Sequence, residues 1–505
     1  MTTQRKAITL LVLTCLLSPL SAMTYAVENE TTGILVIAHG SPKESWCKPI
    51  RELVENVTLS CPIELGFLEF VEELEGYCFI PEAVEKLDAI GVTKIIAVPL
   101  FISSSSGHIA EIEYVLGLRD MWPGEEDPLL QVDTEAEIVL TGAVDDHWTI
   151  AQILVDRVTE LCKNPGNETV IIIAHGTPNE TYFDGWINSL ESLAEQVKLM
   201  LRHSKGLDIE TVRYSFIHVD ETLYPDLMVR AVVENVSATS DPIVVPLMIS
   251  GGFFTETYIP GLLENLTYAY DGKALTPHSN VGKWIEITAS REFSDLTIQI
   301  YDGTELLNIS IEDVGEHHGH ICPCVAIAFR VAELAFSEEI WGGIPHRGDV
   351  KIICGHPSDG HEETFESILN SPDDLMMKKG DVNLTKDNYV YTFMKKSTGD
   401  SITVEVNETI FPEGFFDLRK KCKAKTATPE EMKTFKLAKE ELKESFMFLP
   451  IDAVFSPEAH AVEEIAQEIE EPEEVNVVGG AIFFSMLVIG LILLLALIYG
   501  RRKAR

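Results

Sequence analysis

Positive charge is scarce in this sequence. Its 505 residues include 39 lysines and arginines against 80 aspartates and glutamates, which gives a formal net charge of −41. A chain with this balance lacks the basic surface that nucleic acid requires, so the composition excludes a general nucleic-acid-binding function. An anionic ligand would need a local basic pocket, because the overall field opposes its approach.

Long apolar runs are also few, and two of them stand near the ends. Residues 1–26 begin with a charged stretch, continue apolar and end in small residues, the pattern of a secretory signal peptide. An uncleaved anchor is the alternative. Residues 477–499 are uncharged and long enough to cross a bilayer as a helix, and the basic tail at 500–505 predicts a cytoplasmic C-terminus. We therefore expect a single-pass protein of the cell membrane whose N-terminal domains are extracytoplasmic.

Cysteine is sparse as well, with nine in the chain, of which Cys15 would leave with the signal. The other eight permit disulfides in an exported protein, and Cys47, Cys61 and Cys78 are near enough in sequence for one local bridge. Asparagine carries a clearer sign of export. Nine asparagines begin an Asn-x-Ser/Thr sequon, about four times as many as chance would give, and such sequons accept glycans in exported chains.

The length leaves room for about three domains. Residues 31–165 alternate short apolar runs with amphipathic ones, which predicts strands at 33–38, 63–70, 93–102 and 136–142 and helices at 44–56, 80–90 and 146–162. Residues 166–292 repeat the plan, with a strand at 169–174, a helix at 184–203 and further strand candidates at 212–219, 241–249 and 283–289. This repeated alternation predicts the α/β class, with two tandem parallel-sheet domains.

The pattern changes at about residue 296. Residues 296–425 favour an α+β domain, with a hairpin at 296–314, a helix at 326–336 and strands at 349–355 and 388–396. A charged helix at 429–446 and an acidic run at 458–474 follow. We interpret 426–476 as a charged helix followed by an acidic, solvated stalk that precedes the transmembrane helix.

Two histidines and a carboxylate stand where the first three expected strands end. His39 follows the first strand, Glu69 ends the second, and His108 lies in the loop after the third. Ligands bind beyond the carboxyl ends of parallel strands, and these groups suit divalent cobalt, nickel or iron. Histidine can also take protons from a bound nitrogen ligand. We therefore expect His39, His108 and Glu69 to be catalytic, with the two histidines as metal ligands. A hydrogen-bonding role is the alternative for each one taken singly.

The same segments resemble a known family. GILVIAHGSP at 33–42, GFLEF at 66–70 and IIAVPLFISSSSGHI at 95–109 are similar to the sirohydrochlorin cobaltochelatases of anaerobic cobalamin synthesis, relatives of the class II chelatases. The resemblance implies an α/β fold in two similar halves with a cleft between them. It also implies that His39 and His108 hold the incoming metal and receive pyrrole protons, and that Glu69 is the carboxylate of the FLE motif.

The second half departs from this pattern. It keeps His175, and His218 falls where Glu69 falls, but no histidine stands at the position of His108. We therefore expect one working metal site in the first half and a degenerate partner in the second. A hybrid site of His175, His218 and Glu256 is the alternative.

The substrate class that the resemblance implies is a polycarboxylate, which conflicts with the acidic composition. Lys43, Lys48 and Arg51 follow the first His-Gly pair and are the nearest basic candidates. A local cluster can outweigh distant charge, because salt screens exposed charges beyond about 10 Å. The alternative is that these residues line a solvated helix.

The third domain has a cluster of its own in EHHGHICPC at 316–324. Imidazole and thiolate at close spacing suit zinc or another transition metal. The candidate ligands are His318, His320, Cys322 and Cys354. A disulfide through Cys322 or Cys324 is the alternative. HHGHICP resembles the HGHxCPG string of the formylmethanofuran dehydrogenase E-subunit family, over about 310–410, and this implies metal binding without a firm reaction. Cys324 replaces the usual glycine, and the cysteine-rich zinc ribbon often appended in that family is missing.

These expectations combine into one leading hypothesis, a membrane-anchored chelatase that inserts cobalt or a similar divalent metal into a sirohydrochlorin-type tetrapyrrole. Tetrapyrrole synthesis is normally cytoplasmic, so the alternative is a surface protein that binds metal or a corrinoid without turnover. A third hypothesis is a structural surface protein that has lost both functions.

Overall fold

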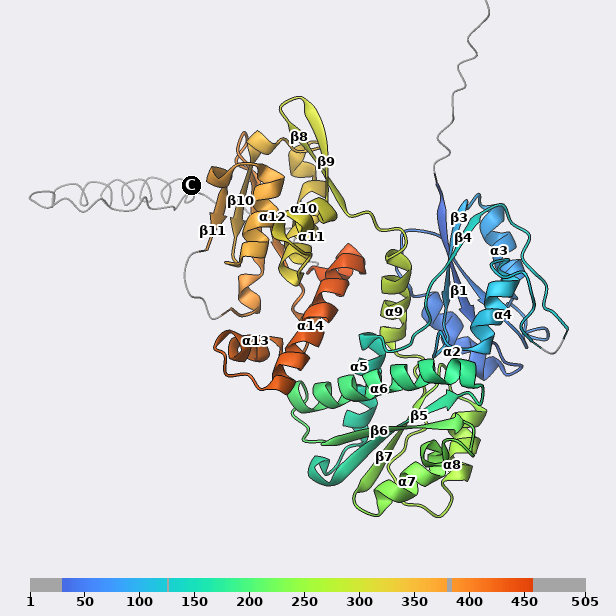
Figure 1. Ribbon diagram of the computed structural model, residues 1–505. Helices are drawn as coiled ribbons and strands as arrows, with labels where there is room; N and C mark the ends of the chain where they lie inside the picture. Colours follow the sequence, from blue (N-terminus) through green and yellow to red (C-terminus); the bar gives the residue numbers. More distant parts are fainter. Residues whose placement is uncertain (1–29, 125–126, 379–383, 457–505) are drawn as a thin grey trace, which may run out of the picture. The chain divides into compact units, whose positions relative to one another are not determined.

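Two parallel sheets make up the first part of the chain (Figure 1). The computed structural model describes residues 30–124, 127–378 and 384–456. The expected signal peptide, acidic run, transmembrane helix and basic tail lie outside these residues. Within them, no helix combines the length and the apolar character that crossing a bilayer requires.

The first sheet has the strand order β2-β1-β3-β4, and all of its pairings are parallel. Its strands are short and rich in isoleucine and valine, as expected for a parallel sheet covered on both faces. The strands are β1 (Thr32–Ala38), β2 (Ile63–Phe67), β3 (Lys94–Pro99) and β4 (Glu137–Leu140). The helices are α2 (Glu44–Val54), α3 (Ile80–Ala89), α4 (Gly107–Val115) and α5 (Trp148–Leu161).

The central strand β1 is buried on both faces, and its side chains alternate between two cores. Leu35 and Ile37 join an apolar cluster with α3 and α4. Val36 and Ala38 join a second cluster that includes α2, α5 and residues of the second sheet. The period of two along a strand produces this division, and the shared cluster ties the two sheets together.

The second sheet is also parallel, with the order β6-β5-β7. Its strands are β5 (Glu168–Gly176), β6 (Thr211–His218) and β7 (Asp241–Leu247). An isolated parallel bridge joins Ile243 of β7 to Ala269. The helices are α6 (Glu180–His203), α7 (Val229–Ser237), a π-helical turn (Phe254–Tyr258), α8 (Ile259–Leu262) and α9 (Ser279–Ser290).

The strand candidate at 283–289 was wrong, because this segment lies inside α9. Side chains on most sides of this helix are buried, among them Trp284, Ile285, Ile287 and Ala289. A helix covered all round has the same dense apolar and β-branched sequence as a buried strand, so periodicity alone cannot separate the two.

Strand register confirms the duplication. In the first sheet Ala38 pairs with Phe67, and in the second Ala174 pairs with Phe216. The histidine after each alanine therefore occupies the same position in both sheets. By the same count, His218 stands where Glu69 stands in the first sheet.

The third part of the described chain is α+β, as expected. A hairpin of β8 (Thr297–Asp302) and β9 (Glu305–Ser310) precedes a mixed sheet with the order β11-β10-β12-β13. The sheet strands are β10 (Val350–Cys354), β11 (Leu375–Met377), β12 (Val390–Lys395) and β13 (Ser401–Glu405). The helices are α10 (Ile311–His318), α11 (Pro323–Ser337), α12 (Asp359–Leu369), α13 (Phe415–Lys423), α14 (Pro429–Phe448) and α15 (Ile451–Val454).

The eight cysteines of the described residues are all free thiols. The expected local bridge among Cys47, Cys61 and Cys78 is therefore not formed. Two of these thiols have backbone acceptors instead: Cys47 donates to the carbonyl of Ser41, and Cys78 to that of Leu65, each at 3.4 Å.

Candidate functional site

The carboxyl ends of β1 and β5 face a single cavity of about 710 Å³, lined by residues from both sheets. Four histidines line it: His39, His108, His175 and His218. His39 follows the last residue of β1, and His175 lies near the end of β5. His108 is in the first turn of α4, and His218 is the last residue of β6. The duplicated fold therefore directs imidazoles from both halves into one space.

The first-half histidines form a close pair. The rings of His39 and His108 have centroids 4.7 Å apart and planes at 81°. His39 Nδ1 lies 3.0 Å from the carbonyl oxygen of Gly40, and His108 Nδ1 lies 2.8 Å from Oε2 of Glu111. Carbonyl and carboxylate oxygens only accept hydrogen bonds, so each Nδ1 carries the proton. Each Nε2 is then left with a free lone pair.

The second-half histidines form a matching pair. The rings of His175 and His218 have centroids 4.6 Å apart, and His175 Nδ1 donates to the carbonyl of Gly176 at 3.1 Å. The proximity of His39 and His108 contributes to lowering the pKa of His175. Both pairs line the same cavity.

Burial keeps most of these imidazoles neutral. Desolvation is the main cause that lowers the pKa of His39 and of His218, and it lowers the pKa of His175 to about 4. Metal ions bind the neutral form of imidazole, so at neutral pH these side chains need not lose a proton before they ligate.

Both His-Gly pairs are explained by backbone geometry. Gly40 has φ +98°, and a Cβ placed there would lie 1.8 Å from the carbonyl oxygen of Glu69. Gly176 has φ +73°, and its Cβ would lie 2.4 Å from the carbonyl oxygen of His218. Only glycine permits this conformation at such a close approach. The glycine lets the chain leave the strand while the preceding histidine faces the cavity.

Several aromatic side chains line the cavity: Trp46, Phe70, Phe101, Trp186, Phe253 and Phe254. Such walls suit a flat, apolar ring system. The rings of the cavity's phenylalanines also pack against the histidines: Phe101 against the first pair, and Phe254 against the second.

Charge in the cavity is limited. Lys43, which is exposed, is the single lysine or arginine among the described lining residues, while Glu111 and Glu256 contribute carboxylates. The other basic candidates are engaged elsewhere. Lys48 pairs with Glu52 at 3.6 Å, and the guanidinium of Arg51 lies over the ring of Tyr77.

The structure thus brings His39 and His108 together, as predicted, and adds His175, His218 and Glu256 to the same cavity. Both histidine pairs line one cavity, and the expectation of a working site in the first half and a degenerate partner in the second stays a prediction. Glu69 is not among the described residues that line the cavity; its backbone N–H donates to the carbonyl of His39. The sequence analysis did not single out Glu111, because it placed His108 in a loop; in the structure both lie on α4, three residues apart, a spacing at which helical side chains meet.

Comparison with known proteins finds relatives of the first part of the chain. A family model described as CbiX matches residues 33–161. The sirohydrochlorin cobaltochelatase of Methanopyrus kandleri is 30% identical over 140 residues, which cover 25% of this chain and 94% of the relative. The sirohydrochlorin cobaltochelatase of Saccharolobus islandicus is 30% identical over 132 residues, with the same two coverages. The chain belongs to the CbiX family.

The family match spans the first sheet and its helices, from β1 to the end of α5. Among solved structures, SirB from Bacillus subtilis with Fe3+ aligns with 52% of this chain and 97% of its own, at 16% identity and a TM-score of 0.39. The CbiX region supplies His39, His108 and Glu111, so both histidines of the first pair and the carboxylate partner of His108 come from it.

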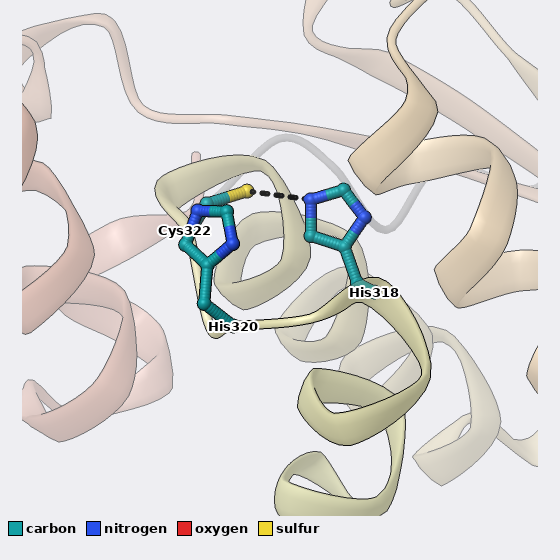
Figure 2. A group of neighbouring side chains, drawn as sticks. All are labelled: His318, His320 and Cys322. Carbon is teal, nitrogen blue, oxygen red and sulfur yellow. Dashed lines mark hydrogen bonds between the residues drawn. The ribbon is translucent and has the colours of Figure 1, made fainter.

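Beyond the CbiX region, the third part of the chain gathers another ligand group. Figure 2 shows His318, His320 and Cys322, whose ligand atoms lie within 4.8 Å of one another. Cys322 Sγ is 3.6 Å from Nε2 of His318, and Nδ1 of His318 lies 2.7 Å from a carboxylate oxygen of Glu363. The neighbouring Cys324 thiol is the main cause that lowers the pKa of Cys322 to about 5. A thiolate and an oriented imidazole are suitable ligands for zinc.

Cys354 takes no part in this group. It points into the apolar core, where its thiol donates to the carbonyl of His356 at 3.3 Å and burial raises its pKa to about 12. Cys324 joins His356 and His361 in a second group of ligand atoms. The expected set of His318, His320, Cys322 and Cys354 therefore retains three members.

Proposed function

We propose that this CbiX-family protein inserts cobalt, or a similar divalent metal, into a sirohydrochlorin-type tetrapyrrole. We further propose that it is anchored in the cell membrane, with the cavity outside the cytoplasm. The observation that carries the catalytic proposal is the convergence of His39, His108, His175 and His218 on one aromatic-walled cavity. The metal and the macrocycle are both substrates.

The metal is held first by neutral imidazoles. His39 and His175 each have Nδ1 committed to a backbone carbonyl, so their Nε2 lone pairs are the free donors. The lowered pKa of each ring favours the metal over a proton at neutral pH. Imidazole nitrogen suits cobalt, nickel, iron and zinc, so the donor set does not by itself choose among them.

The pyrrole N–H protons must leave as the metal enters the ring, and His108 is the best-placed acceptor. His108 donates a hydrogen bond from Nδ1 to the carboxylate of Glu111. Its Nε2 can accept a pyrrole proton, and the carboxylate stabilises the imidazolium that forms. His108 can then release the proton to solvent, since its side chain is 42% exposed.

Export has its own support in the placement of the sequons. Within the described chain Asn407 is half-buried, and the other sequon asparagines are exposed: Asn56, Asn167, Asn179, Asn235, Asn265 and Asn308. A glycan needs an accessible amide. These positions are therefore compatible with an extracytoplasmic, glycosylated protein.

A non-catalytic binding protein is the second candidate, and the cavity charge favours it. One lysine and two carboxylates give a polycarboxylate macrocycle little attraction at the contact surface. Such a protein would capture metal or a corrinoid at the cell surface and would not need the proton acceptor pair of His108 and Glu111.

Turnover distinguishes the two candidates. The full chain is incubated with sirohydrochlorin and Co²⁺, and the visible absorption of the macrocycle is followed. A chelatase accelerates the spectral change over the protein-free rate, and His39→Ala with His108→Ala removes the acceleration. His346→Ala, at an exposed histidine outside the cavity, is the control. A rate equal to the protein-free rate, or one that survives the double substitution, would refute the catalytic proposal.

We also propose that His318, His320 and Cys322 bind zinc or another transition metal, in a domain related to the E-subunit family of formylmethanofuran dehydrogenase. The support is the closeness of the three ligand atoms and the carboxylate behind His318. Zinc content of the purified full chain, with and without Cys322→Ser, tests this. An unchanged zinc content would contradict it.

A further inference from the structure

We propose that Cys324, His356 and His361 form a second metal site in the third part of the chain, adjacent to the group of His318, His320 and Cys322 and independent of the chelatase proposal. One ligand atom from each of the three residues lies within 4.8 Å of the other two. Both histidines have no exposed surface, and Cys324 is half-buried. The site is therefore built into the fold and not formed by exposed side chains.

Three chain segments meet at this site. Cys324 is in the first turn of α11, His356 follows the end of β10, and His361 is in the first turn of α12. The two helix starts are in close contact, because a Cβ placed on Gly360 would lie 2.9 Å from Cβ of Cys324. Any larger residue at 360 would push the thiol away from the imidazoles.

The histidines are arranged as metal ligands usually are. Ser358 Oγ lies 3.1 Å from Nδ1 of His356 and 2.8 Å from Nδ1 of His361. The hydroxyl of Tyr391 lies 2.7 Å from Nε2 of His361. A metal-bound histidine typically uses its second nitrogen for a hydrogen bond that fixes the ring. The Ser358 hydroxyl serves this purpose for His356, whereas His361 has a hydroxyl on both nitrogens, so a metal would replace one of its two partners.

One nitrogen has no such partner. Nε2 of His356 is buried and makes no hydrogen bond. A buried polar atom without a partner is unfavourable, because folding removes its water and supplies nothing in return. A metal ion bound there would satisfy this nitrogen, so the orphaned atom points to a missing ligand.

The donor set specifies the class of metal. One thiol and two imidazoles suit zinc, or cobalt as its spectroscopic substitute, with a fourth position left for water or another ligand. Hard cations such as calcium and magnesium prefer oxygen ligands and are disfavoured. Cys324 is the residue that replaces glycine in the HHGHICPC string, so the motif resemblance does not account for this group.

Cobalt spectroscopy of the full chain can separate the two groups. Thiolate ligation gives Co²⁺ an intense charge-transfer band, and the described lining of the CbiX cavity contains no cysteine that could contribute. We expect Cys322→Ser to retain about half of the wild-type band, and the further change His356→Gln to remove it. Cys422→Ser, at a half-buried cysteine in α13, is the matched control and should leave the band intact.

Two results would overturn the site: loss of the whole band in Cys322→Ser, or survival of its residual band after His356→Gln. The unmodified chain provides a check that does not depend on the variants folding. Loaded with cadmium-113, it should give two resonances in the thiolate-shifted region of the NMR spectrum, one for each group. A single such resonance would refute a separate site.

Discussion

Replacing Glu111 with glutamine isolates the part of the proposed mechanism that depends on charge. Glu111 accepts a hydrogen bond from Nδ1 of His108 at 2.8 Å. A glutamine side-chain oxygen can still accept this bond, so the imidazole keeps its tautomer and orientation. What disappears is the negative charge that stabilises the imidazolium form after a pyrrole proton has been taken.

The expected effect is modest but measurable. Loss of a carboxylate that is hydrogen-bonded behind a functional histidine typically lowers activity about 10- to 100-fold. The side chains of His108 and Glu111 are 42% and 19% exposed, so water screens part of the interaction. We therefore expect the lower end of that range, about a tenfold decrease in the metal-insertion rate, or about 1.4 kcal/mol of transition-state stabilisation.

The assay follows the macrocycle absorption under saturating Co²⁺, so that the rate reports proton removal and not metal capture. Glu113→Gln is the matched control, because Glu113 lies on the same helix and pairs with Arg119 at 2.6 Å. It should leave the rate unchanged. Equal rates for Glu111→Gln and Glu113→Gln would refute the role of the carboxylate.

Three further predictions concern other parts of the structure. Gly40→Ala should destabilise the protein by about 2–4 kcal/mol in chemical denaturation, because its Cβ would clash with a backbone oxygen. Gly117→Ala, also at positive φ but in open space, should cost only about 1 kcal/mol; equal costs would contradict the clash. Lys43→Ala should raise KM for an anionic tetrapyrrole, most strongly at low salt, whereas Lys48→Ala should not; equal effects would argue against Lys43 as a cavity contact. Burial raises the pKa of Glu441 from 4.5 to about 8. Between these two values the native state binds more protons than the unfolded state. The free energy of unfolding should therefore fall as pH rises across that interval, by up to about 5 kcal/mol. Glu441→Gln should flatten this dependence in thermal melts at pH 5 and pH 8, and parallel curves for the two proteins would refute it.

The strands of the two parallel sheets could be predicted because their apolar runs are short and bounded by turn residues. The ends were less certain: the segment expected at 93–102 forms a strand only over Lys94–Pro99. The segment at 283–289 was assigned to the wrong class, because α9 is buried on most sides and leaves no polar stripe to mark its period.

The part of the site that follows from the common direction of neighbouring strands could be predicted. His39 and His108 follow strands of one parallel sheet, and the carboxyl ends of such strands meet at one edge. The joining of both histidine pairs in one cavity was not predictable in this way. It depends on how the two sheets pack through their shared core, which involves residues more than a hundred positions apart.

Cys354 was expected to join the ligand group of the third domain and does not, and the sequence of β10 contains the reason. Val350, Ile352 and Cys354 alternate along β10 and all point into the apolar core. A thiol on that face could not reach the polar loop that holds His318. Cys324, in contrast, lies at the start of a helix, where the preceding loop and the next helix start can both approach it.

The duplication explains why the two halves of the cavity can differ in role. Equivalent positions place His39 and His175 symmetrically, each fixed by the carbonyl of its own glycine. The next positions diverge: the first half adds His108 with the Glu111 carboxylate, while the second adds His218, and burial lowers its pKa. The carboxylate gives His108 a partner that can stabilise an imidazolium, whereas burial opposes a proton on His218. Under the proposed function, His39 and His175 hold the metal, one from each half, while His108 removes the protons, a division that a symmetric pair of sites could not make.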